Sequence, residues 1–174
     1  MRIRYYDSSE ASLKGNVILS EVNVRLYSQR DFEALDALWR ELLAYHQGLS
    51  DQVHGPEATT DWVAYMHKCL ITTTVEFHLA ELDGAIVGFV SYRMFMGKQA
   101  AEIENIMVSP SARRKGIGTT LLKAAEETLA AAKIKTIEIN CIYANTDAAE
   151  FYKKHGYTPK AIRFNKQLKE GVLQ

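Results

Sequence analysis

The chain has 174 residues, of which 47% are hydrophobic and 24% are charged, a composition typical of one globular domain with a single buried core. Its 21 basic and 21 acidic residues cancel, so the composition indicates neither a nucleic-acid partner nor a membrane surface. No apolar run approaches the roughly 20 residues of a membrane span, and charged residues interrupt the N-terminal stretch that a secretion signal would occupy. We therefore expect a cytoplasmic protein, with residues 1–20 as an extension ahead of one domain over 21–174.

The first part of the domain predicts a strand followed by two helices. Alternating apolar residues over 22–26 indicate a strand. Ser28-x-x-Asp31 resembles a capping box and predicts a helix over 31–46, with an apolar face that ends at Tyr45. A second helix is expected over about 60–70, and its aromatic and apolar stripe suits a core or the wall of a substrate cleft.

A hairpin and a parallel crossover are expected next. Asp83-Gly84 lies between apolar runs at 77–82 and 85–92, a strong hairpin signal because both turn positions need a positive φ. The remaining expected elements, in chain order, are a strand over 101–108, a helix from about 117, a strand marked by Ile137, Ile139 and Cys141, a helix from about 147 to 156, and a weakly alternating last strand over 161–169. Strand, helix and strand over 101–142 make a parallel crossover, and open α/β sheets bind ligands at the carboxyl end of such a first strand.

The two cysteines do not indicate a disulfide or a metal. Cys69 and Cys141 fall in segments expected to be regular and lack metal-ligand spacing. We expect both to be reduced core residues, and we expect no metal site.

The segment V-S-P-S-A-R-R-K-G-I-G over 108–118 is the most informative part of the chain. Gly116 and Gly118 allow a tight turn and a close approach of backbone N–H groups to a ligand. The helix that begins there adds unpaired amide donors and the positive end of its dipole, and three consecutive basic residues at 113–115 add full charges. These groups together predict a site for an anion with two or more phosphates.

Two well-known phosphate-binding loops fit this segment poorly. A nucleotide-binding P-loop needs its lysine after the second glycine, whereas Lys115 precedes Gly116. A dinucleotide-binding loop needs a third glycine at the position that Leu121 occupies. A simple glycine-containing turn with solvated arginines is the remaining alternative.

Two motifs resemble the GCN5-related N-acetyltransferases (GNAT). Arg113-x-x-Gly116-x-Gly118 is similar to the Gln/Arg-x-x-Gly-x-Gly/Ala loop that binds the pyrophosphate of coenzyme A in that family. The run from Asn145 to Tyr157 resembles the family segment N-x-x-A-x-x-F-Y-x-x-x-G-F/Y. The resemblance is close over 102–159 and looser over 22–170. It implies an α/β, single-domain GNAT-like fold: a mixed twisted sheet with splayed parallel central strands and flanking helices.

The resemblance also implies acetyl-coenzyme A as the cofactor. Its pantetheine arm would lie between the splayed strands and pair with backbone near Met107 and Val108. Asn145 could reach the same arm, although an asparagine in such a position, taken alone, is more often a helix cap or turn residue. The implied cofactor-binding residues are Met107, Val108, Arg113, Arg114, Lys115, Gly116, Ile117, Gly118, Thr119, Asn145, Phe151 and Tyr152.

Acyl transfer to an amine needs a base, a donor to the oxyanion and an acid for the departing thiolate. Glu102 and Glu104 are the candidate bases, and their even spacing predicts one strand face shared with Ile106 and Val108. Some family members carry the glutamate at the position of Glu102 and others at that of Glu104; we favour Glu104, with a salt bridge or solvated strand face as the alternative for both. Tyr152 is the candidate acid, because an unperturbed phenol has a pKa near 10 and stays protonated at neutral pH. Its alternative is a core tyrosine, and the oxyanion donor would be a backbone N–H near 107–108.

The expected function is transfer of an acetyl group from acetyl-coenzyme A to a primary amine by direct attack in a ternary complex. The acceptor is a small-molecule amine or a peptide amine, held by cleft walls at 45–75 and 93–100. A non-catalytic acyl-coenzyme A sensor and a nucleotide-binding protein with an altered loop are the alternatives. The resemblance makes a homodimer feasible, although the sequence indicates no surface for it.

Overall fold

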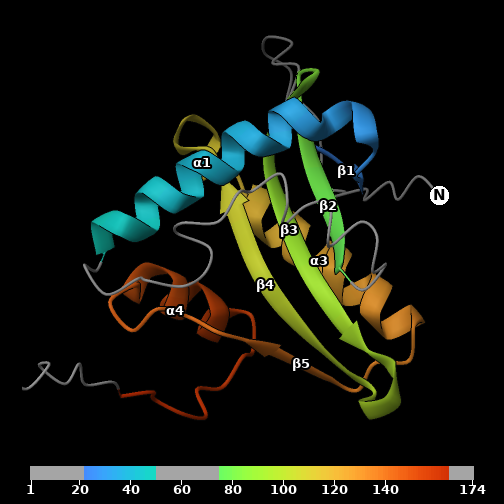
Figure 1. Ribbon diagram of the computed structural model, residues 1–174, viewed down its shortest axis with the longest axis vertical. Helices are drawn as coiled ribbons and strands as arrows, with labels where there is room; N and C mark the ends of the chain where they lie inside the picture. Colours follow the sequence, from blue (N-terminus) through green and yellow to red (C-terminus); the bar gives the residue numbers. More distant parts are fainter. Residues whose placement is uncertain (1–21, 50–74, 165–174) are drawn as a thin grey trace, which may run out of the picture.

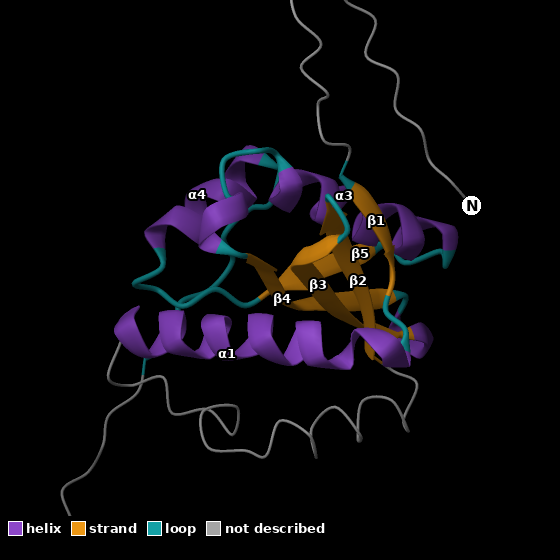
Figure 2. Ribbon diagram, turned by 90° about the horizontal axis from the view of Figure 1, so that it is seen from above, coloured by secondary structure: helices purple, strands orange, loops and turns teal. Residues whose placement is uncertain are grey.

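The computed structural model describes residues 22–49 and 75–164. Within them five strands form one sheet in the order β1-β2-β3-β4-β5. The strands are β1 (Asn23–Leu26), β2 (Val75–Leu82), β3 (Ala85–Phe95), β4 (Ala100–Val108) and β5 (Thr136–Ile139). Neighbours from β1 to β4 are antiparallel, whereas β4 and β5 are parallel and joined through α3 (Ile117–Ala131), as expected for the crossover. Figure 1 shows the twisted sheet, and Figure 2 shows α1 (Phe32–Leu49) on one face and α3 on the other.

The predicted start of α1 is confirmed, with a short 3₁₀ turn before it. The Ser28 backbone N–H and hydroxyl both donate to Asp31 Oδ2, at 2.9 and 2.7 Å, which is the carboxylate half of a capping box. The 3₁₀ turn η1 covers Gln29–Asp31, and α1 continues from Phe32 to Leu49. Arg25 on β1 binds both oxygens of Asp31, at 2.7 and 2.8 Å, so this helix start is attached to the first strand.

The hairpin is confirmed. Its turn residues Asp83 and Gly84 have φ of 52° and 80°, as a two-residue turn between twisted strands requires. Gly88, further along β3, meets a tighter constraint: a Cβ there would lie 2.7 Å from the Met107 carbonyl oxygen on β4. Only a residue without a side chain lets the two strands approach so closely.

Two apolar clusters fill the two faces of the sheet. The cluster under α1 includes Leu35, Leu38, Trp39, Leu42, Phe77, Leu79, Phe89 and Met107. The cluster under α3 includes Ala80, Val90, Tyr92, Ala101, Ile103, Leu121, Leu122, Ala125 and Leu129. The face of each strand residue can therefore be read from the cluster it joins.

A β-bulge in β4 changes that alternation. Ser91 on β3 pairs with Asn105, but the next residue, Tyr92, pairs with Ile103, so Glu104 is the extra residue. Ala101 and Ile103 join the α3 cluster before the bulge, whereas Ile106 and Val108 pack against that cluster after it. The prediction that Glu102 and Glu104 share a face with Ile106 and Val108 is therefore wrong, because the bulge reverses the parity of the strand.

The parallel pair ends early. β5 pairs with β4 from Ala100↔Thr136 to Ile103↔Ile139, and β4 then runs on for five more residues beside β3 alone within the described chain. The expected splay of the two central strands is confirmed. The bulge at Glu104 lies where the strands part.

The C-terminal part differs from the prediction in two places. α4 (Thr146–Lys154) forms as expected and ends before Gly156, whose φ of 89° is left-handed. Residues 161–164, expected to begin a last strand, have no regular secondary structure and are exposed. Cys141, expected on a buried strand face, is exposed because β5 ends at Ile139. Cys69, the helix expected at 60–70, the extension 1–20 and the end of the expected last strand lie outside the described residues.

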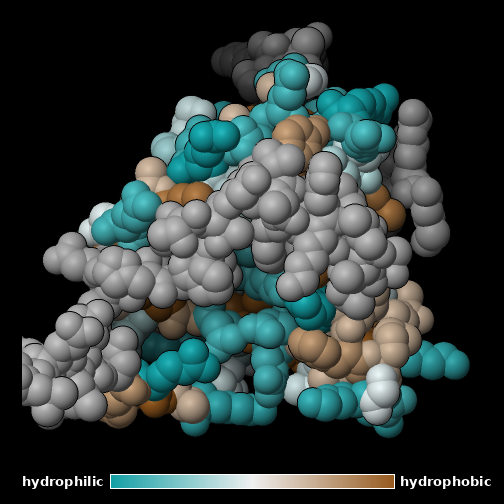
Figure 3. Space-filling view, in the orientation of Figure 1, coloured by the Kyte–Doolittle hydropathy of each residue, from teal (hydrophilic) through white to brown (hydrophobic). Residues whose placement is uncertain are grey.

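An apolar area lies at the turn between β3 and β4. Phe95 is 38% exposed and Met96 61% exposed, and Figure 3 shows apolar colour near the end of the sheet where β3 turns into β4. None of the described helices is both long and apolar enough to cross a membrane.

Candidate active site

The loop from β4 to α3 has the geometry of an anion site. Ser109 is held by its N–H to the Val87 carbonyl, at 2.8 Å, and the 3₁₀ turn η4 (Pro110–Ala112) follows. The backbone then turns through Arg114 and Gly116, with φ of 64° and 77°. Gly116 caps α3 without a side-chain hydrogen bond, so the first amides of this 15-residue helix are available to a ligand.

The two glycines have different roles. The backbone at Gly116 is left-handed and therefore favours glycine, as expected for a tight turn. Gly118 lies within the helix, and a Cβ there would meet Phe151 at 3.6 Å and Val108 at 3.9 Å, which are ordinary contacts. The protein alone therefore does not require glycine at 118.

The three basic residues are all exposed, and they are held differently. Arg113 Nε donates to the Val108 carbonyl oxygen at 2.9 Å, and its guanidinium lies 5.5 Å from the centre of the Tyr45 ring. Arg114 and Lys115 make no hydrogen bond or ion pair with any other described residue. Two of the three charges are therefore directed to solvent at the start of α3.

Asn145 follows β5 and lies at the start of α4. It is therefore on the β5 side of the opening, the gap where β4 and β5 part after Ile103↔Ile139. Its Oδ1 accepts the Ala148 N–H at 3.2 Å and caps α4, so the helix-cap alternative is confirmed. The same oxygen accepts the Tyr45 hydroxyl at 3.2 Å. Asn145 is 9% exposed, and none of the described residues accepts a hydrogen bond from its Nδ2.

Thr119 in the first turn of α3 is tied to α4. His155 Nδ1–H donates to the Phe151 carbonyl oxygen at 2.8 Å, so its Nε2 is the acceptor for the Thr119 hydroxyl at 3.0 Å. The Thr119 side chain is thus occupied within the protein. Only its backbone N–H can serve a ligand at this loop.

The two candidate bases have different partners. Glu104, whose side chain is 16% exposed, accepts from Arg93 Nε on β3 at 2.7 Å. Glu102 accepts from Asn140 Nδ2, just beyond the end of β5. Glu102 thus belongs to the closed part of the sheet and Glu104 to the point where it opens.

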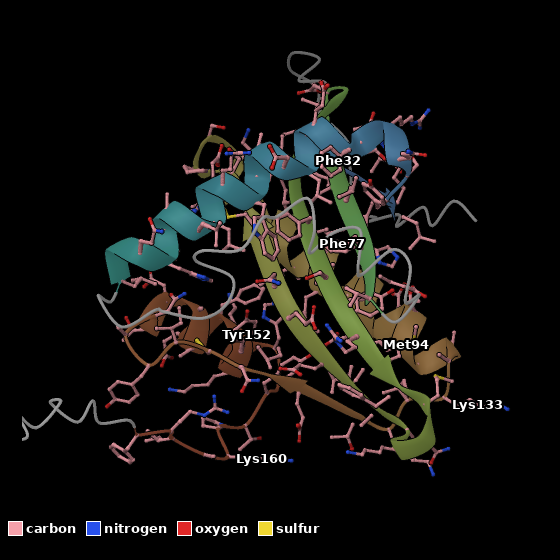
Figure 4. All side chains as sticks on the ribbon, viewed as in Figure 1. Phe32, Phe77, Met94, Lys133, Tyr152 and Lys160 are labelled. Carbon is pink, nitrogen blue, oxygen red and sulfur yellow. The ribbon has the colours of Figure 1, made fainter. Side chains whose placement is uncertain are left out.

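Tyr152 is held on α4 among aromatic rings. The centre of its ring lies 5.4 Å from that of Phe151 and 6.0 Å from that of Tyr157. Burial raises its pKa above the ordinary value for tyrosine, and the neighbouring Cys141 thiol adds to the effect. Figure 4 shows Tyr152 on the side of α4 that faces β4.

A groove of about 420 Å³ lies between α1 and the β4–α3 loop. Its lining residues are Glu41, Ala44, Tyr45, Met107, Ser109, Pro110, Ser111 and Arg113. Met107 and Arg113 were expected at a cofactor site, whereas Tyr45 was expected on the apolar face of its helix and at the start of the acceptor-cleft wall over 45–75, not at the cofactor site. No sequence signal predicts the contact between Tyr45 and Asn145, because they are 100 residues apart in the chain.

Two buried polar residues beside the bulge are also missing from the sequence-based expectations. Asn105 Nδ2 donates to Ser91 Oγ at 3.2 Å, and the two residues are 9% and 0% exposed. The one available signal was the presence of Asn105 inside an apolar strand, since buried polar groups need partners.

These features fit an extended ligand with a pyrophosphate and an amide-containing arm. The amides at the start of α3 and the adjacent positive charges suit the pyrophosphate. The last five residues of β4 have no strand partner on the β5 side within the described chain, and none of the described residues accepts a hydrogen bond from Asn145 Nδ2. Coenzyme A has both chemical parts. The described residues contain no group of His, Cys, Asp or Glu that could hold a metal ion.

Comparisons with known proteins give the same picture. Residues 35–157 match the family described as acetyltransferase (GNAT) family. The chain is 33% identical over 103 residues to the aminoalkylphosphonate N-acetyltransferase of Salmonella typhimurium, covering 57% of this chain and 67% of that protein. It is 28% identical over 120 residues to a putative [ribosomal protein bS18]-alanine N-acetyltransferase of Bacillus subtilis, covering 66% of this chain and 78% of that protein.

A solved structure shares the fold. The PaiA N-acetyltransferase of Thermoplasma acidophilum, crystallised with coenzyme A, is similar with a TM-score of 0.68 and 20% identity, covering 82% of this chain and 93% of that chain. The family match favours the enzyme over the sensor and nucleotide-binding alternatives. The chain belongs to the GNAT family of acetyltransferases and is an N-acetyltransferase that uses acetyl-coenzyme A.

Proposed function

We propose that the enzyme acetylates a small primary amine by direct attack within a ternary complex, with Glu104 as the base and Tyr152 as the acid. The observation that carries this proposal is the opening of β4 from β5 after Ile103↔Ile139, with Glu104 at the bulge where the strands part. A ligand arm inserted between the strands would end beside this carboxylate. Acetyl-coenzyme A supplies the thioester whose acetyl group is transferred.

We assign the cofactor to the loop and the two sides of the opening. Arg113, Arg114, Lys115 and the backbone from Gly116 to Thr119 bind the pyrophosphate through charge and amide donors. Met107 and Val108 offer backbone groups to the pantetheine arm, and Asn145 Nδ2 donates to it from the other side. Phe151, which packs beside Gly118, and Tyr152 form the α4 wall of the same opening.

Glu104 takes the proton of the attacking ammonium group, directly or through a bound water. Its ion pair with Arg93 fixes the direction of Oε1, and its position at the bulge keeps the carboxylate near the opening. Glu102 is the second candidate, because it lies on the same strand and is partly buried. The backbone N–H of Met107 or Val108 is the candidate donor to the carbonyl oxygen of the acetyl group.

Tyr152 donates a hydrogen bond to the departing sulfur. Because burial raises its pKa, the phenol stays protonated throughout the neutral range. A thiol resembling cysteine has a pKa near 8.5, so full transfer of the proton from tyrosine is uphill. A hydrogen bond that strengthens as charge develops on sulfur is the more favourable role.

Direct attack agrees with the chemistry of Cys141. Although the residue as a whole is exposed, desolvation raises the pKa of its thiol, which disfavours the thiolate needed for a covalent acyl carrier. Its Sγ lies 3.6 Å from the carbonyl oxygens of Ile142 and Asn145.

The acceptor is tested with a panel in which coenzyme A release is measured by thiol detection. Two relatives suggest aminoalkylphosphonates and peptides with an N-terminal alanine. Polyamines and aminoglycosides complete the panel as amines of other classes. We expect turnover with a small amine, and double-reciprocal plots at several fixed acceptor concentrations should intersect. Parallel lines, together with acetylation of Cys141, would refute the ternary complex. Turnover confined to peptides would refute the small-amine assignment.

A further inference from the structure

The end of α1 contacts both parts of the proposed cofactor site. Tyr45, in the last turns of α1 (Phe32–Leu49), lies with its ring 5.5 Å from the Arg113 guanidinium and donates its hydroxyl to Asn145 Oδ1 at 3.2 Å. Arg113 belongs to the pyrophosphate loop, and Asn145 belongs to the far side of the opening between β4 and β5. One side chain therefore links three elements around this opening.

The hydroxyl of Tyr45 determines how the Asn145 amide is presented. Asn145 Oδ1 accepts two hydrogen bonds, from the Ala148 N–H and from Tyr45, which fills its two acceptor positions. The amide nitrogen must then point to the other side, where no described residue accepts from it. A carbonyl oxygen of an amide-containing arm is the partner that this donor suits.

The ring of Tyr45 acts on Arg113 in a different way. Arg113 Nε is already bound to the Val108 carbonyl, at 2.9 Å, and the aromatic ring lies against the guanidinium. The attraction between the cation and the ring restricts a long exposed side chain that would otherwise sample many rotamers. Its terminal nitrogens, which bind none of the described residues, stay beside the start of α3, where a phosphate would lie.

We propose that Tyr45 is a positioning residue for acetyl-coenzyme A, whose hydroxyl orients Asn145 toward the pantetheine arm and whose ring holds Arg113 toward the pyrophosphate. The inference rests on the cofactor-binding residues assigned above. The two functions of this side chain can be separated by substitution. Tyr45→Phe removes the hydroxyl and keeps the ring, whereas Tyr45→Leu removes both.

Calorimetric titration with two ligands tests this separation. Coenzyme A carries both the pyrophosphate and the pantetheine arm. Adenosine 3′-phosphate 5′-diphosphate has the same nucleotide and pyrophosphate but lacks the arm. Tyr45→Phe should raise the Kd for coenzyme A by about fivefold, the effect of one hydrogen bond, and leave the Kd for the shorter ligand within about twofold. Tyr45→Leu should raise both, with about a further threefold loss from the ring. Tyr45→Phe should also raise the KM for acetyl-coenzyme A while kcat is retained.

Two further variants keep the test decisive. Tyr92→Phe removes a tyrosine hydroxyl that donates to Glu76 Oε2, at 2.9 Å, on the α3 face of the sheet; it should leave both Kd values unchanged whatever it does to the melting temperature. In an Asn145→Ala background, Tyr45→Phe should cause no further loss of coenzyme A affinity. Equal weakening of both ligands by Tyr45→Phe, or no weakening of either, would overturn the role of Tyr45. If Asn145→Ala itself leaves coenzyme A binding unchanged, the earlier assignment of Asn145 fails instead.

Discussion

The first four residues of β4 lie between two strands, whereas its last five have only β3 beside them within the described chain. Ala101 and Ile103 in the first half are 1% exposed and join the α3 cluster. The second half starts at the bulge and ends at the loop that carries Arg113. One strand thus contains a part that holds the sheet together and a part that is open to a ligand, and the bulge at Glu104 separates them.

The largest expected effect concerns the two glutamates, because they lie on either side of this division. Glu104→Gln should lower kcat by about 10²–10⁴-fold, the range for loss of a general base, and leave the Kd for coenzyme A unchanged. Glu102→Gln is the matched control, with the same chemical change two residues earlier, and should cost much less. The measurement is steady-state kinetics with melting curves for both variants. A larger loss for Glu102→Gln would move the base to the closed half of the strand.

Truncation in the closed half should affect stability instead of chemistry. Ile103→Ala removes a side chain that is 1% exposed and pairs across to Ile139, and it should lower the free energy of unfolding by about 2–5 kcal/mol. Denaturant unfolding measures this loss. Activity per folded molecule should change little; a large fall in kcat in fully folded protein would show that the two halves of β4 are not independent.

The close contact between β3 and the open half gives a smaller effect of mixed character. Gly88→Ala would place a Cβ 2.7 Å from the Met107 carbonyl oxygen and 3.3 Å from Leu121 Cδ1. The strands must move apart, so we expect a loss of about 1–3 kcal/mol in unfolding free energy and weaker coenzyme A binding. Gly48→Ala on α1 is the control. A Cβ there would meet no atom of the described chain within 4 Å, so the substitution should be neutral or stabilising. Unchanged stability in Gly88→Ala would mean that β4 can shift without cost.

The sequence predicted best the features that depend on residues close together in the chain. Local signals succeeded: Asp83-Gly84 identified the hairpin, Ser28-x-x-Asp31 the start of α1, and Gly116 the turn into α3. Each depends on residues that are neighbours in the chain. The family resemblance supplied the splay, which no local pattern reveals.

Long-range geometry accounts for the failures and omissions. The bulge at Glu104 is a matter of strand register, so periodicity alone placed Ile106 and Val108 on the wrong face. Cys141 continues the apolar alternation of β5, but the strand and its pairing with β4 both end at Ile139. The contact of Tyr45 with Asn145 joins residues that only the folded sheet brings together.

The smallest expected effect concerns Tyr152 on α4. It tests whether the reaction proposed beside the open half of β4 also uses a side chain from α4. Tyr152→Phe should lower kcat by about tenfold, less than a full general acid would, because its role is a hydrogen bond to the sulfur. Burial raises the pKa of Tyr152 above the ordinary value near 10, so the protonated form, and with it the rate, should persist to that pH. The same shift makes the stabilising contribution of the phenol complete below pH 10; this contribution is lost as pH rises toward the folded pKa, because the unfolded state releases the proton first. A pH–rate profile of the wild type and of Tyr152→Phe, with melting temperatures from pH 7 to 11, measures both. If the wild-type rate falls with an apparent pKa well below 10 and Tyr152→Phe removes that fall, the pKa of Tyr152 is lowered and not raised, and the buried hydrogen-bond role is wrong.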